Sequence, residues 1–119
     1  MPQASRFQFE VRKPDGAEAE LAKREAARAF LRSDDLAAEQ WIRSLLKVNP
    51  QSFAAHALRG QIADRAGHRE EALRHYQQAL RLLDAGADQQ FFQANHPSVV
   101  TNALEGLKNT VREHSRPRN

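Results

Sequence analysis

The histidines are the residues of this sequence best suited to metal binding, but their spacing does not favour it. His68 and His75 are seven residues apart, which separates them by about 10 Å along a helix. The chain has no His-Glu-x-x-His motif and no two histidines four residues apart, the spacings that bring two imidazoles to one metal ion. We therefore expect solvated helix residues and no metal site.

The remaining reactive side chains also have structural explanations. Glu70 and Glu71 begin a predicted helix, where negative charge favours the helix dipole. No serine sits in a Gly-x-Ser-x-Gly elbow, and the glycine motifs that cradle phosphates are absent. Trp41 has helical spacing to Leu45 and Val48, so we expect it to pack between helices. These observations predict a protein without enzymatic activity and without a cofactor.

Composition and charge narrow the function classes further. The 119 residues suit one domain, and the absence of cysteine excludes disulfides and thiolate chemistry. The net charge of +3 is spread along the chain with both signs interspersed, so we expect no specific nucleic-acid binding. No run of ten apolar residues occurs. This predicts no membrane span, no signal peptide and a cytoplasmic location.

Helix signals dominate the chain after residue 16. The segments Ser33-Asp34-Asp35 and Gln51-Ser52 each offer a cap for the start of a helix, and Gly67 is suited to end one. Val100, Leu104, Leu107 and Val111 form an apolar stripe on the last predicted helix. The expected helices are 17–32, 36–47, 53–66, 69–83, a short piece at 88–94 and a last helix at 97–114, before a disordered tail at 115–119.

Residues 1–16 have a different pattern and are expected to form an extended N-terminal arm. Phe7, Phe9 and Val11 alternate with polar residues, as in a strand, and Pro14-Asp15-Gly16 then predicts a turn. One interpretation is an arm that lies against the helices or a loose terminus. The other is a strand that pairs with its copy on another subunit or with another part of a longer protein.

The helical region contains an internal repeat of 34 residues. At this shift, small residues recur where two helices must approach closely, and bulky residues recur where a gap must be filled. Repeated helix packing requires this pattern. Pro50 ends one helix pair, and Asp84 occupies the equivalent end of the next. The aligned pairs are Ala26 with Gly60, Ala29 with Ala63, Ala38 with Ala72, Ile42 with Tyr76, and Leu45 with Ala79.

These residues resemble the tetratricopeptide repeat (TPR) family. The repeats are 19–52 and 53–86, and the run from Gly67 to Leu80 follows the family's second-helix pattern most closely. Ala22 and His56 replace the family's first-helix aromatic residue. Pro97 excludes a third standard repeat, so residues 87–114 are expected to be a linker and a capping helix. The resemblance implies an all-α solenoid of two antiparallel helix hairpins, within a domain at 17–114.

The resemblance also implies a peptide-binding groove lined by the first helix of each repeat. Within the family, a clamp for chaperone C-termini needs asparagines where this chain has Ala27 and Leu58, so that ligand is not expected. Basic side chains favour a partner with acidic residues, and an apolar anchor would rest on Phe30 and Leu58. The matching positions are Glu20, Lys23, Arg24, Ala27, Phe30, Ala57, Leu58, Gln61, Asp64 and Arg65.

The sequence therefore predicts a non-enzymatic protein-interaction module, an adaptor or scaffold that binds a peptide or helix in this groove. Two alternatives stay open: a module for self-association, such as a homodimer, and an accessory domain of a larger assembly or enzyme. For single groove residues a plainer interpretation also remains, in which the alanines only pack and the charges form a solvated face.

Overall fold

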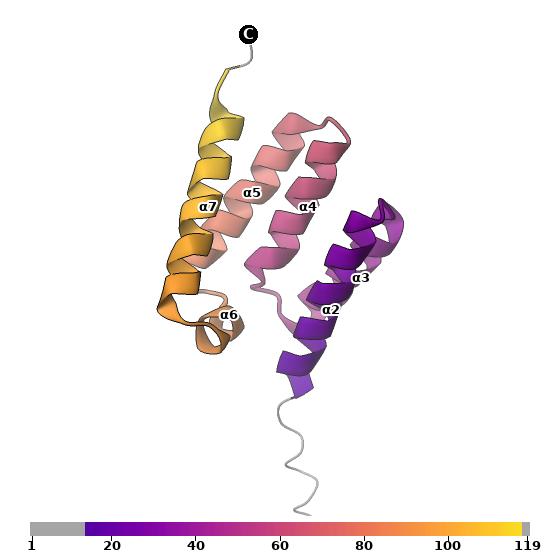
Figure 1. Ribbon diagram of the computed structural model, residues 1–119, viewed down its shortest axis with the longest axis vertical. Coiled ribbons are helices and arrows are strands. Elements are labelled where there is room, and N and C mark those ends of the chain that lie inside the picture. The colour runs from indigo at the N-terminus through magenta and orange to yellow at the C-terminus, as the bar shows by residue number, and fades with distance from the viewer. Residues whose placement is uncertain (1–13, 118–119) are drawn as a thin grey trace, which may run out of the picture.

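The computed structural model describes residues 14–117, which form six α-helices and contain no strand (Figure 1). Over this part the chain is all-helical, as the sequence predicts, and no helix in it is long and apolar enough to cross a membrane. The predicted strand of Phe7, Phe9 and Val11 lies outside the described residues. The helices are α2 (Pro14–Leu31), α3 (Asp35–Val48), α4 (Phe53–Arg65), α5 (Arg69–Asp84), α6 (Gln89–Ala94) and α7 (Pro97–Ser115).

The local signals for helix ends act as predicted. The Asp34 carboxylate accepts a hydrogen bond from the backbone N–H of Ala37, and the Ser52 hydroxyl accepts one from that of Ala55, each at 3.2 Å. Gly67 follows α4 with a φ of +85°, a left-handed conformation that glycine adopts without steric cost. These signals set the start of α3 and both ends of α4.

Two predicted boundaries are wrong at the ends of the helical region. The turn expected at Pro14-Asp15-Gly16 is instead the first turn of α2. Proline is well suited to this position because its fixed φ is helical and the first helical N–H has no intrahelical partner. At the other end, Ser115 still belongs to α7, one residue into the predicted tail.

The helices pack mainly against their neighbours in sequence. The closest associations are α2 with α3, α4 with α5, and α5 with α7. Viewed as in Figure 1, α2, α4 and α7 lie in front, with α3 and α5 behind them. One core cluster includes Ile42 and Leu45 of α3, and a second includes Leu83 of α5 and Leu107 of α7.

All ten residues of the five pairs related by 34 residues are buried. The Gly60 and Tyr76 contact shows why residue size matters there. A Cβ atom on Gly60 would lie 2.6 Å from Cε1 of the Tyr76 ring, closer than carbon atoms approach one another. The absence of a side chain at Gly60 therefore lets the ring of Tyr76 pack directly on the backbone of α4.

A buried carboxylate joins the two halves of the fold. Asp88, at 3% exposure, accepts hydrogen bonds from the Asn49 side-chain amide at 3.0 Å, from the Phe53 N–H at 3.1 Å and from the Phe91 N–H at 3.2 Å. The Phe53 N–H belongs to the first residue of α4, while Asp88 itself is the N-cap of α6. One side chain thus caps two helices and holds the connection between α3 and α4.

Candidate functional site

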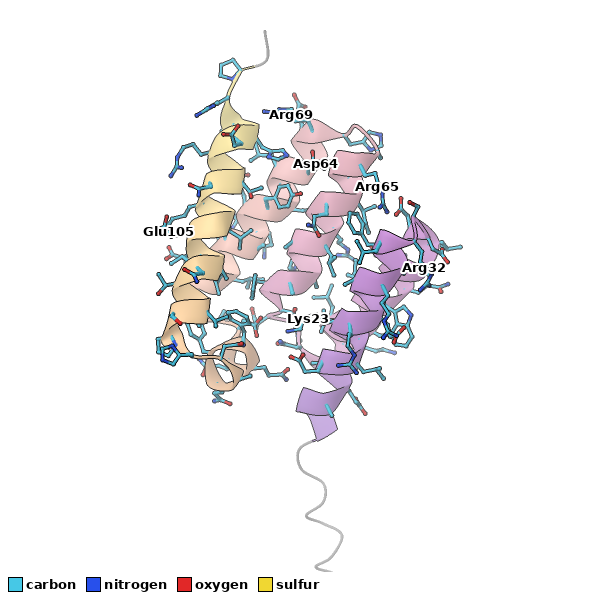
Figure 2. The ribbon with its side chains drawn as sticks, viewed as in Figure 1. Lys23, Arg32, Asp64, Arg65, Arg69 and Glu105 are labelled. Atoms are coloured by element: carbon cyan, nitrogen blue, oxygen red, sulfur yellow. The ribbon has the colours of Figure 1, made fainter. Side chains whose placement is uncertain are left out.

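The predicted groove residues occupy α2 and α4, which are neighbours on the front of the molecule in Figure 2. Glu20, Arg24 and Ala27 are spaced i, i+4 and i+7, so they share one side of α2. Ala57 and Gln61 are four residues apart and share one side of α4. Glu20, Arg24 and Gln61 are exposed, and both alanines are half-buried. We call these five residues the α2–α4 face.

Arg65, predicted as an open groove residue, is committed to contacts within the chain. Its guanidinium stacks on the Phe30 ring at 3.9 Å from the centroid, donates to the Phe30 carbonyl oxygen at 2.6 Å, and pairs with the Asp35 carboxylate. Phe30 packs against the first core cluster. Arg65 therefore fastens α4 to the connection between α2 and α3, and the Phe30 ring is covered by this guanidinium.

Leu58 also departs from its predicted role. The side chain is only 8% exposed and belongs to the first core cluster, with Ala26 and Ile42. The expectation that Leu58 would offer a partner an apolar anchor is therefore wrong, because the leucine already fills the space between the helices.

Asp64 faces the C-terminal helix. Its Oδ2 accepts a hydrogen bond from the Tyr76 hydroxyl at 3.3 Å and lies 2.8 Å from Nε2 of His114. The ring of His114 also meets that of Tyr76 edge to face, with centroids 5.0 Å apart. Burial and the Asp64 carboxylate raise the pKa of Tyr76, so this hydroxyl remains a donor. Asp64 thus joins α4 to α5 and α7.

Lys23, on α2, lies toward α6 (Figure 2). Its ammonium is 3.1 Å from the Glu20 carboxylate and 5.9 Å from the centroid of the Phe91 ring on α6. Phe91 in turn meets Phe53 edge to face, with centroids 4.7 Å apart. The sequence offered no local signal for the Lys23 and Phe91 contact, because the two residues are far apart in the chain.

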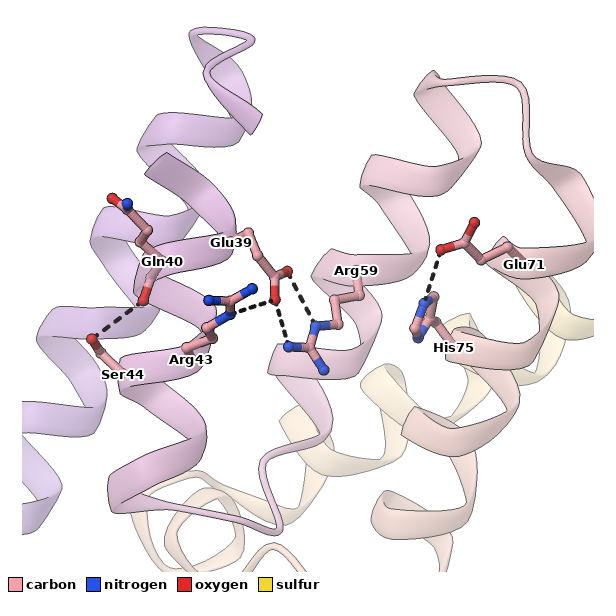
Figure 3. A network of polar contacts seen from close by, with 7 residues as sticks. All are labelled: Glu39, Gln40, Arg43, Ser44, Arg59, Glu71 and His75. Atoms are coloured by element: carbon pink, nitrogen blue, oxygen red, sulfur yellow. Dashed lines mark hydrogen bonds and ion pairs between the residues drawn. The ribbon is translucent and has the colours of Figure 1, made fainter. Parts of the chain in front are cut away.

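A second polar network connects α3 and α4 on the other side of the fold (Figure 3). Arg59 donates from Nε and Nη2 to the two oxygens of Glu39, at 3.2 and 2.6 Å, and Arg43 reaches the same carboxylate at 3.4 Å. Burial alone would raise the pKa of Glu39, but the hydrogen bonds and charges of Arg59 and Arg43 outweigh burial and lower it. Glu39 is therefore a stable anion.

His56, on the same helix as Arg59, has its pKa lowered by burial and by the positive charges of Arg59 and His75. The imidazole is thus held in its neutral form. Among residues 14–117, no cluster of three or more histidine, aspartate and glutamate side chains could hold a metal ion.

The structure therefore divides the ten predicted residues into two groups. Five are buried or contact a residue on another helix: Lys23, Phe30, Leu58, Asp64 and Arg65. The other five form the α2–α4 face, and among them Glu20 pairs with Lys23 on its own helix. Within the described part of the chain, Arg24 and Gln61 make no side-chain hydrogen bond or ion pair. A comparison of the chain with protein-family models, curated proteins and solved structures finds no match.

Proposed function

We propose that this chain is a non-enzymatic interaction module of the TPR kind, an adaptor or scaffold built from two helix hairpins and a capping helix. The burial of all five residue pairs that the 34-residue shift aligns supports this proposal. So does the packing of α2 with α3 and of α4 with α5, with α7 against α5. Such stacked helix pairs present extended surfaces to partner proteins.

The α2–α4 face is the observation that carries the proposal. Ala27 on α2 and Ala57 on α4 are half-buried, so each helix presents a small, shallow apolar surface. The exposed side chains of Arg24 and Gln61 lie beside these alanines. Small residues allow a partner backbone to approach closely, and polar side chains beside them can fix its position. With Lys23 and Arg65 occupied, Arg24 is the residue that favours an acidic group on the partner.

Affinity capture followed by quantitative mass spectrometry tests this function. The bait is the full chain, compared with Arg24→Glu/Gln61→Glu and with the control Arg32→Glu/Gln40→Glu, which makes the same charge changes at exposed positions away from the face. A partner that is lost with the first variant and retained by the control supports the proposal. Equal retention by both variants refutes binding at this face.

Self-association is a second candidate, favoured by two exposed leucines. Leu31 ends α2 at 78% exposure, and Leu36 lies in the first turn of α3 at 74%. Apolar side chains this exposed on both sides of one turn are suited to contact another molecule. Light scattering after size exclusion tests the idea: a dimer that Leu31→Ser/Leu36→Ser converts to monomer supports it, and a monomeric wild type excludes it at the concentration used.

A further inference from the structure

A cavity of about 450 Å³ lies among α3, α4 and α5, near the network in Figure 3. Its volume falls within the range of roughly 300–1,000 Å³ typical of ligand pockets. Ile62, Ala63 and Ala66 of the α4 segment supply its apolar lining. Charged and imidazole side chains supply the rest. The cavity therefore combines an apolar surface with polar groups, as a site for an amphipathic side chain requires.

The charges on the α3 side of this cavity are already paired. Arg59 holds Glu39 with two hydrogen bonds, and Arg43 approaches the same carboxylate from the surface. Because both guanidinium groups are directed to Glu39, neither is open to an entering anion without breaking an existing pair. The lowered pKa of Glu39 agrees with this arrangement.

On the α5 side of the cavity, the carboxylate of Glu71 can accept further hydrogen bonds. Glu71 Oε1 lies 3.5 Å from Nδ1 of His68, and its Oε2 lies 3.6 Å from Nε2 of His75. Both separations exceed the 2.7–3.2 Å of ordinary N–H···O hydrogen bonds. The imidazoles carry positive charge only when protonated. Glu71, at 48% side-chain exposure, can therefore accept hydrogen bonds from a further donor at the cavity.

We propose that this cavity binds an arginine side chain of a partner protein. The aliphatic stem would cover Ile62 and Ala66, and the guanidinium would donate to Glu71. Arginine fits better than lysine because its planar fork can bind both oxygens of a carboxylate, while its stem buries apolar surface. This surface is separate from the α2–α4 face, so the inference goes beyond the function proposed above and does not depend on it.

The probe for this site is N-acetyl-arginine methylamide, titrated into the isotope-labelled full chain and followed by amide chemical shifts. We expect saturable shifts at Ile62, Ala66, Glu71 and His75. N-acetyl-norleucine methylamide, which has an apolar stem and no charge, should produce little change. Glu71→Gln should weaken arginine binding by at least about tenfold, as expected for the loss of a charge-assisted hydrogen bond.

The matched control is Glu70→Gln. Glu70 lies beside Glu71 in the first turn of α5, so its replacement removes the same helix-dipole contribution, but the residue does not line this cavity. The proposal requires that Glu70→Gln bind the arginine probe within about twofold of wild type. Equal weakening by both variants, equal binding of the norleucine probe, or no saturable shift would each overturn it.

Discussion

Replacement of Gly60 by alanine should destabilise the protein, although alanine is the better helix former. Three ring atoms of Tyr76 would lie 2.6, 2.8 and 2.9 Å from the new Cβ. The ring has little room to move, because it is 5% exposed and its hydroxyl donates to Asp64. Overpacking of this kind costs about 2–3 kcal/mol, and helix propensity returns about 1 kcal/mol. The expected net loss is about 1–2 kcal/mol.

Gly106 provides the matched control, since it lies within α7 and a Cβ there would meet nothing within 4 Å. Gly106→Ala should therefore gain about 0.5–1 kcal/mol from helix propensity alone. Urea unfolding of the two variants and wild type measures both changes. If Gly60→Ala were as stable as Gly106→Ala, the close packing of Tyr76 on α4 would be refuted.

A double variant separates the ring from other causes. Tyr76→Leu removes the aromatic atoms that the Cβ would meet, so the destabilisation by Gly60→Ala should largely disappear in that background. The coupling free energy should equal the overpacking cost of about 2–3 kcal/mol, within the range for residues in direct contact. A loss that persists unchanged would place the strain in the backbone of α4 and not at the ring.

Three further predictions follow from single polar groups. Asp88→Asn should lower the free energy of unfolding by about 2–3 kcal/mol, because a neutral amide replaces the carboxylate that accepts three hydrogen bonds. Asp84→Asn, at an exposed position, is the control, and its urea melt should match that of wild type. Arg65→Met should cost about 1–2 kcal/mol through the lost contacts to Phe30 and Asp35, whereas Arg32→Met should be neutral. The folded pKa of His56 is lowered, so the unfolded chain takes up more protons as pH falls through about 6.5 and stability declines. His56→Gln should reduce this decline between pH 7.5 and 5.5, and an unchanged slope would contradict the assignment.

The helices could be predicted because their signals are local. Asp34, Ser52 and Gly67 act within a few residues of the ends they define, so the sequence alone contains the necessary information. The turn expected at Pro14 was wrong because proline followed by polar residues also suits the first turn of a helix. Only the continuation of α2 beyond these residues distinguishes the first turn of a helix from an isolated turn.

The candidate site could be predicted only in part. Helical spacing located Arg24 and Gln61 correctly on exposed positions. It could not show that Arg65 stacks on Phe30, since these residues are 35 positions apart and meet only when α4 packs beside α2. The Glu39 and Arg59 pair joins residues 20 positions apart on different helices. The cavity beside it likewise depends on the packing of three helices, which no local pattern encodes.

The shared cap at Asp88 has a consequence for how the molecule opens. In an ideal repeat array each unit interacts with its neighbours only, and the ends can unravel independently. Here, displacement of the α5–α6 connection would leave the first amide of α4 without its acceptor. It would also release the Asn49 side chain, which lies in the α3–α4 connection, from Asp88. Fraying from the C-terminal end is thereby opposed at the middle of the chain, and the two helix pairs should melt as one cooperative unit.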